Sequence, residues 1–196
     1  DLDVYDIPFD FLWEGTTDDA ADLTGQFSVT YDDDYLYLAI QVTDDRVVSN
    51  IAPNDIKGHW RSDSVEITVD PQGAGVSEHT LTTFKTGIFP FDTEGSVQAE
   101  RDADANQGPI ATTAPDMLFA SQATDDGYIL EVAIPWNAVP GDVQSGDEIG
   151  LNVLIYDCDK AEAVVGENCN EARTAWSAWS QIQGNPRLWG HARLED

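Results

Sequence analysis

The stretch FSVTYDDDYLYLAIQV, residues 27–42, decides the fold class of this chain. Polar and apolar residues alternate through it with a period of two, and only the run Asp32-Asp33-Asp34 interrupts the alternation. This alternation is typical of half-buried strands, and a short polar run between two such segments is typical of a turn. The stretch therefore predicts a β-hairpin with strands at 27–31 and 35–42.

The same alternation recurs along the rest of the chain. Residues 64–70 carry Val65, Ile67 and Val69 on one face, so Glu66 is expected to point away from the apolar side of its strand. Further strands are predicted at 79–85, 118–123, 128–135, 150–156, 174–177 and 188–194, with one helical turn at 134–139 and the longest loop at 93–115. The sequence predicts an all-β fold, a two-sheet antiparallel β-sandwich, formed by residues 1–196 as a single domain.

The charge of the chain excludes some classes of partner. The 196 residues include 37 Asp and Glu but only 9 Lys and Arg, for a formal net charge of −28. Nucleic acids and anionic membrane surfaces are bound by clustered Lys and Arg, so neither is an expected partner. A neutral ligand or a cation is better suited to the negative electrostatic field of the chain. Adaptation to high salt is a second explanation for the excess of acidic residues.

The two cysteines, Cys158 and Cys169, lie close together in the sequence. Because no His or further Cys accompanies them in a metal-binding spacing, we expect a single disulfide and a secreted, extracellular protein. Two free thiols in a cytosolic protein are the alternative.

Catalytic motifs are missing from the sequence. It has no Gly-x-Ser-x-Gly elbow, and His59, His79 and His191 have no zinc-binding spacing. A catalytic pair of carboxylates of the glycosidase type cannot be recognised among so many acidic residues, because any two of them can meet by chance. A binding protein is therefore expected, not an enzyme.

Acidic residues gather where the predicted strands end, and carboxylates in such loops can converge on a hard cation. We expect structural calcium at one or more of these groups, with solvated acidic turns as the alternative. The candidate ligands are Asp44, Asp45, Asp55, Asp63, Asp157 and Asp159.

Trp60 stands in a polar setting, between Lys57-Gly58-His59 and Arg61-Ser62-Asp63. Six residues later Glu66 is expected to face outward from its strand. An aromatic ring can stack on the C–H groups of a sugar while a carboxylate accepts hydrogen bonds from its hydroxyls. The pair therefore indicates a sugar-binding site, although an exposed strand glutamate beside a buried tryptophan is also an ordinary structural arrangement.

Several motifs resemble, in order and over nearly the whole chain, the family 9 carbohydrate-binding modules of the DOMON-like sandwich group. The matching segments are 27–38, Thr43-Asp44-Asp45-Arg46-Val47, Trp60-x-x-Asp63-Ser64-Val65-Glu66-Ile67, 127–136, Gly150-Leu151-Asn152 and Trp189-Gly190. The resemblance implies a site that holds the reducing end of a β-glucan or xylan chain between two tryptophans, with calcium stabilising loops.

The resemblance also implies roles for individual residues. Trp60 corresponds to the first tryptophan, Glu66 to the carboxylate that grips the sugar, and Lys85 replaces a usual arginine. The second tryptophan is expected where this sequence has Gln183, which leaves Trp179 as the nearest replacement. Leu154 stands where a glutamine is expected.

Together these features predict a secreted, non-catalytic carbohydrate-binding module for neutral plant-type polysaccharides or oligosaccharides. It is expected to be a monomeric module in a multidomain protein, where it targets an attached enzyme to its substrate. One alternative is a calcium-stabilised structural or adhesion domain that has lost its sugar site. Another is a haem-binding electron-transfer domain, for which Met117 is the only methionine available as a ligand.

Overall fold

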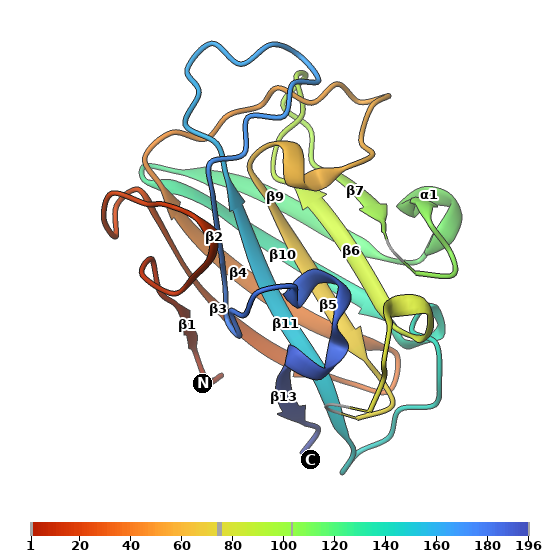
Figure 1. The fold of residues 1–196 in the computed structure, drawn as a ribbon. Coiled ribbons are helices and arrows are strands. Elements are labelled where there is room, and N and C mark those ends of the chain that lie inside the picture. The colour runs from red at the N-terminus through yellow and green to blue at the C-terminus, as the bar shows by residue number, and fades with distance from the viewer. Residues whose placement is uncertain (1, 74–75, 103, 196) are drawn as a thin grey trace.

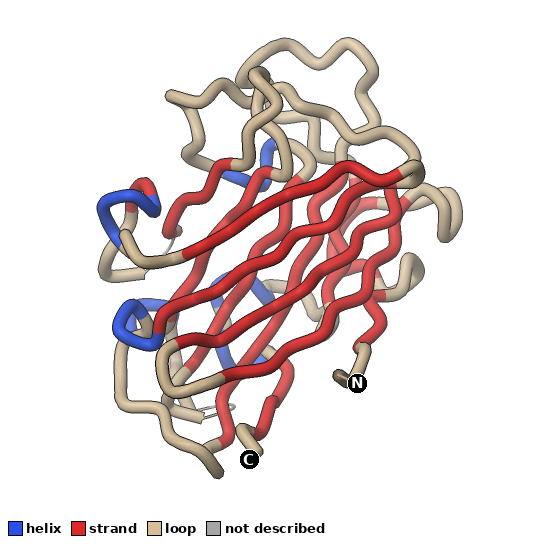
Figure 2. Tube along the Cα trace, turned by 180° about the vertical axis from the view of Figure 1, so that it is seen from behind, coloured by secondary structure: helices blue, strands red, loops and turns tan. Residues whose placement is uncertain are grey.

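The computed structural model describes residues 2–73, 76–102 and 104–195. Two antiparallel sheets pack face to face, one in front of the other in Figure 1 and in the opposite order in the view from behind (Figure 2). The predicted all-β sandwich is therefore confirmed. Among the described residues, no helix is long and apolar enough to cross a membrane.

The first sheet contains the hairpin predicted from residues 27–42. Its strands are ordered β1-β3-β4-β10-β9. Their bounds are Tyr5–Ile7 (β1), Leu23–Tyr31 (β3), Tyr35–Asp44 (β4), Leu118–Thr124 (β9) and Gly127–Pro135 (β10). The hairpin is β3 and β4, which pair in register from Leu23 opposite Asp44 to Tyr31 opposite Leu36.

The second sheet is ordered β2-β12-β11-β5-β6-β7-β8, and β13 also pairs with β11. The bounds are Leu12–Gly15 (β2), Ser64–Asp70 (β5), Phe84–Phe89 (β6), Gln98–Arg101 (β7), Gly108–Pro109 (β8), Glu148–Asp157 (β11), Ala172–Ala175 (β12) and Gly190–Arg193 (β13). The central strand β5 spans the seven residues that its alternation predicts.

The main hydrophobic core lies between the two sheets. It takes the apolar face of the hairpin, including Leu38 and Ile40, and the apolar face of β5, including Val65 and Ile67. Met117 is buried in the same core, which is the position of a packing residue.

Three predictions about local structure are wrong in part. Residues 79–85 form the 3₁₀ helix η2 (Thr80–Thr82) before β6, and the side chain of His79 caps it by accepting a hydrogen bond from Leu81 N. The predicted strand 188–194 begins as the 3₁₀ helix η5 (Pro186–Leu188). The expected loop 93–115 contains β7, β8 and the short helix α1 (Ile110–Thr113). The helical turn predicted at 134–139 is confirmed as η3 (Trp136–Ala138).

The outer face of the second sheet is covered in its middle, so β5 is buried on both faces. A second hydrophobic cluster lies there, with Tyr156, Ile182 and Trp189 at its centre and Trp13 and Trp60 packed against it. The covering segments include η1 (His59–Arg61) and η4 (Ile182–Gly184). Polar side chains on this face are thereby enclosed, and the candidate site lies among them.

Candidate functional site

Glu66 lies at the middle of the covered face of the second sheet. Its neighbours across the strands are Leu154 on β11 and Gly87 on β6. As predicted, Glu66 points away from the apolar side of β5, but it is only 1% exposed. A carboxylate this deeply buried requires charged or hydrogen-bonding partners.

Three side chains supply those partners. His59 Nε2 lies 2.7 Å from Glu66 Oε2, and the Tyr156 hydroxyl donates to the same oxygen at 3.1 Å. Lys85 Nζ lies 3.1 Å from the other oxygen, Oε1. The ion contact with Lys85 does not have hydrogen-bond geometry, and Oε1 accepts no hydrogen bond from any described residue. This buried oxygen therefore keeps an unused capacity to accept a hydrogen bond.

The charges of these groups depend on one another. Burial alone would raise the pKa of Glu66, but Lys85 and His59 outweigh it and hold the pKa at about 2. Burial also disfavours the protonated His59 ring, yet Glu100 and Glu66 outweigh burial and raise the pKa of His59 above its ordinary value. Burial and the nearby Glu66 raise the pKa of Tyr156, so its hydroxyl stays protonated and donates.

Glu100 fixes the other side of the His59 segment. Its Oε1 accepts hydrogen bonds from Gly58 N at 2.6 Å and His59 N at 3.1 Å, and lies 3.5 Å from His59 Nδ1. The imidazole is thus held between two carboxylates, Glu66 and Glu100.

A hollow of about 340 Å³ opens above this network, and Glu66 and Lys85 line it. Lys85 Nζ donates to the Gln183 carbonyl at 2.8 Å, and Gln183 Nε2 donates to the Tyr156 hydroxyl at 2.8 Å. These bonds tie η4 to the network. The remaining lining residues are Trp60, Asp102, Arg173, Gln183 and Gly184.

Arg173 enters the hollow from β12. Its guanidinium carbon lies 5.1 Å from the ring centroid of Trp13 and 5.5 Å from that of Tyr156, distances at which cations and aromatic rings attract. Arg173 Nε donates to Asn170 at 2.5 Å, and Nη1 donates to Glu14 at 2.6 Å. Its Nη2 donates to no described residue, so this nitrogen is available to a ligand.

Four of the five sugar-binding residues named from the sequence line this one hollow: Trp60, Glu66, Lys85 and Gln183. Trp179 does not line it, and its side chain is 57% exposed just before η4. Leu154, at the expected glutamine position, is fully buried beside Glu66 in the second hydrophobic cluster.

Sequence reasoning missed His59, Asp102, Tyr156 and Arg173 at this site. The only signal for His59 was its place next to Trp60, and nothing local in the sequence marked the other three.

The predicted disulfide between Cys158 and Cys169 is present. Cys169 N donates to the Arg61 carbonyl at 2.9 Å, so the disulfide loop is attached to η1, which carries Trp60. Cys158 N donates to Asp63 Oδ1 at 2.7 Å. The bridge therefore connects the hollow with the acidic end of β11.

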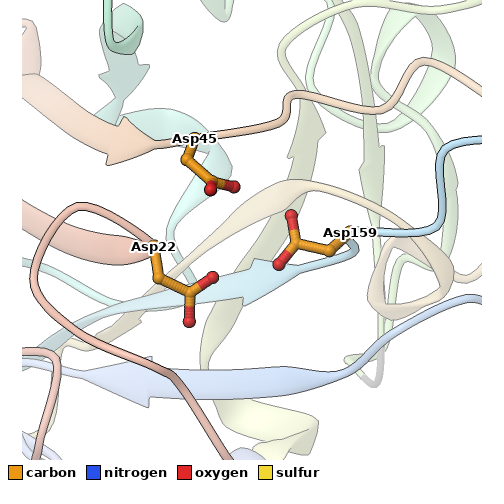
Figure 3. A group of neighbouring side chains, drawn as sticks. All are labelled: Asp22, Asp45 and Asp159. Carbon is orange, nitrogen blue, oxygen red and sulfur yellow. The ribbon is translucent and has the colours of Figure 1, made fainter.

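Two groups of three carboxylates lie at this end of the sandwich. Asp44, Asp63 and Asp157 form a buried group, and Asp22, Asp45 and Asp159 form a more exposed one. Figure 3 shows the carboxylates of the second group turned toward a common space from three separate segments. Asp22 had no signal in the sequence.

Asp55 lies in neither group, and its carboxylate pairs with Arg61 at 3.0 Å. The other five predicted cation ligands are all brought together in the two groups.

The donor set of these groups fits a hard cation such as calcium. Asp157 is 1% exposed, yet neither of its carboxylate oxygens has a hydrogen-bond partner among the described residues. Burial and the neighbouring Asp159 raise the pKa of Asp157 to about 9, and burial with Asp22 raises that of Asp159 to about 7. Unpaired carboxylate oxygens that repel one another are what a divalent cation would stabilise.

Comparison with known proteins adds a family assignment to this geometry. A family model described as "Carbohydrate family 9 binding domain-like" matches residues 3–196. Two curated proteins each match at 28% identity over 162 residues: Exoglucanase XynX of Acetivibrio thermocellus and Endo-1,4-beta-xylanase A of Thermoanaerobacterium saccharolyticum. The matched region covers 83% of this chain but only 12% of each relative, so the chain spans a small part of their length.

Solved structures show the same fold. A carbohydrate binding module family 9 from Caldicellulosiruptor kristjanssonii superposes with a TM-score of 0.71 in complex with cellotriose and 0.70 in complex with glucose. Sequence identity is 17%, and the alignments cover 99% of this chain and 83% and 84% of those chains. At this identity the likeness supports the sandwich fold alone.

Proposed function

Because this chain belongs to the carbohydrate family 9 binding domain-like family, we propose that it binds neutral β-glucan or xylan chains through the hollow at Trp60. The family is one of non-catalytic binding modules, so the chain is a carbohydrate-binding module and not an enzyme. The observation that carries the proposal is the convergence of Trp60, Glu66 and Lys85 on one hollow.

The chemistry of the hollow suits a sugar ring. The half-buried Trp60 offers an apolar face for C–H groups, as aromatic rings do in many ligand sites. Glu66 Oε1 can accept a hydrogen bond from a hydroxyl group, and Arg173 Nη2 can donate one to a sugar oxygen. Because these polar groups are held by other residues before a ligand arrives, little ordering opposes binding.

The charge balance favours a neutral sugar over an acidic one. The cations at and around the hollow are Lys85, Arg173 and protonated His59. The carboxylates of Glu66, Glu100, Glu14 and Asp102 offset them, and the whole chain is strongly negative. Uronate-rich chains would gain no net attraction here.

The work of the module is to keep an attached glycan-degrading domain close to its substrate, which raises the local substrate concentration without new chemistry. The two enzymes named above support this role, because the chain corresponds to only 12% of each of them. The disulfide supports secretion, since such bonds persist in oxidising compartments.

Structural calcium belongs to the same proposal. Asp44, Asp63 and Asp157 would hold one ion, and Asp22, Asp45 and Asp159 would hold a second. Bound calcium would join the end of β4 to the end of β11, and these two strands belong to different sheets.

The proposal is tested by isothermal titration of the wild type with glucose, cellobiose, xylobiose and the borohydride-reduced disaccharides in calcium buffer. Trp60→Ala should weaken binding roughly 5- to 150-fold, the range for losing one stacking contact of about 1–3 kcal/mol. Trp179→Ala is the matched comparison, and it should change affinity less than twofold because Trp179 does not line the hollow.

Loss of binding on reduction of the disaccharides would identify a module that reads the reducing end. If no sugar binds the wild type, or if Trp60→Ala binds as the wild type does, the proposed site is wrong. Absence of sugar binding by the wild type would favour a calcium-stabilised structural domain, whereas unchanged binding by Trp60→Ala would mean that the sugar binds elsewhere on the chain.

A further inference from the structure

A second hollow adjoins the first along the same face of the sheet. Its volume is about 390 Å³, and its lining includes Asn54, Lys57 and Gln107. Asp102 lines both hollows. The two are therefore neighbouring parts of one surface that runs from β5 across β6 to the end of β7.

The wall that carries Asn54 and Lys57 is fixed in place. Arg61 donates to the carbonyls of Asp55 and Lys57, each at 2.7 Å, and to the Asp55 carboxylate at 3.0 Å. At the end of the same segment, Gly58 N donates to Glu100 at 2.6 Å. A ligand would thus meet a wall that is already formed.

Four polar side chains that line the second hollow are unengaged. Among the described residues, none makes a hydrogen bond or ion pair with the side chains of Asn54, Lys57, Asp102 or Gln107. Two amides, a carboxylate and an ammonium offer both donors and acceptors, which is what a surface rich in hydroxyl groups requires.

The charged residues that line the second hollow are offset by partners, and Glu100 among them faces His59, whose pKa is raised, at 3.5 Å. Lys57 is matched by Asp102, Asp55 is paired with Arg61, and Arg101 in the floor is paired with Asp104. A hollow that is polar without net charge suits a neutral ligand that offers many hydroxyls.

We propose that this second hollow is a further subsite that binds the next units of the same neutral glycan chain, with Asp102 between the two positions. The inference rests on the proposed function of the Trp60 hollow. Adjacent strands lie about 4.8 Å apart, so Glu66 on β5 and Asp102 at the end of β7 are separated by about 10 Å across the sheet. A chain seated on Trp60 and extended across the strands reaches the second hollow.

The test is a length series of gluco- and xylo-oligosaccharides, from one to five units, titrated into the full chain in calcium buffer. Affinity should rise by about tenfold once the sugar is long enough to enter the second hollow, as expected for one or two added hydrogen bonds. In the double variant Asn54→Ala/Gln107→Ala this gain should vanish, so that long sugars bind no more tightly than short ones. Gln122→Ala, an exposed amide on β9 of the other sheet, should keep the gain.

Equal affinity for all lengths above the disaccharide, or a gain that survives in the double variant, would overturn the subsite. These results differ from failure of the proposed function, in which Trp60→Ala has no effect on any sugar. Thermal unfolding of each variant identifies losses of affinity that come from misfolding.

Discussion

Gly87 provides the space that the ring of His59 occupies: a Cβ built on Gly87 would lie 2.1 Å from His59 Cγ. The ring is fully buried, and its position over β6 is what brings Nε2 to within 2.7 Å of Glu66. A glycine with no side chain therefore makes room for one of the three side chains that hold the central carboxylate of the hollow.

Gly87→Ala should displace His59 and disturb the Glu66 network. We expect a loss of about 1–3 kcal/mol in the free energy of unfolding, typical of overpacking, together with weaker sugar binding. Urea unfolding and titration with cellobiose measure the two effects. Gly184→Ala is the matched control for stability, because a Cβ there would meet no atom within 4 Å. Equal stability of the two variants would contradict the prediction.

The buried network should stabilise the fold most strongly in mildly acidic solution. The pKa of Glu66 is about 2, below its ordinary value of 4.5, so its contribution is present above about pH 4.5 and is lost as the pH falls through about 2. The pKa of His59 lies above its ordinary 6.5, so its contribution is complete below about pH 6.5 and is lost as the pH rises through the raised pKa.

His59→Gln tests this pH dependence. Compared with the wild type in saturating calcium, it should lose roughly 3 kcal/mol of unfolding free energy at about pH 5.5, as for a broken buried ion pair, and less at an alkaline pH above the raised pKa of His59. His191→Gln changes an exposed histidine and should differ little from the wild type at either pH. A loss for His59→Gln that is independent of pH would mean that only packing is involved.

The sequence predicted the strands better than their surroundings. The hairpin of β3 and β4 and the strand β5 follow from alternation, which is a local property of the chain. The burial of Glu66 does not follow from it, because the segments that cover β5, η1 and η4, come from distant parts of the sequence. Residues 79–85 include a 3₁₀ turn that His79 caps, and the polar and apolar pattern of this segment did not distinguish that turn from a strand.

The candidate site was predictable only where a motif marked it. Trp60 and Glu66 are near each other in the sequence, so their pairing could be inferred directly. Arg173 reaches the hollow because β12 pairs with β11 in a register that sets Arg173 opposite Tyr156, and no sequence pattern reveals a register between strands. Asp22 likewise lies beside Asp45 and Asp159 because the fold brings together three separate parts of the sequence.

Arg173 should contribute directly to sugar binding. Arg173→Lys keeps the positive charge but loses the planar guanidinium, and with it the free Nη2 that can donate to a ligand. We expect affinity for cellobiose to fall about tenfold, as for one lost charged hydrogen bond. Glu14→Gln removes the carboxylate that Arg173 contacts at an exposed position and should change affinity little. If Glu14→Gln weakens binding as much as Arg173→Lys, the role of Arg173 is structural.

Calcium should stabilise the chain through specific ligands and not through general screening of its charge. Adding EDTA at constant ionic strength should lower the melting temperature, since an ion present at about 100 times its Kd adds about 2.7 kcal/mol to the folded state, or roughly 5–10 °C for a chain of this size. Asp157→Asn should reduce this response because it removes a buried, unpartnered ligand. Asp55→Asn should keep it, because Asp55 pairs with Arg61 outside both carboxylate groups. A melting temperature that rises with NaCl but ignores EDTA would show that the acidity serves salt adaptation and that the carboxylate groups hold no structural ion.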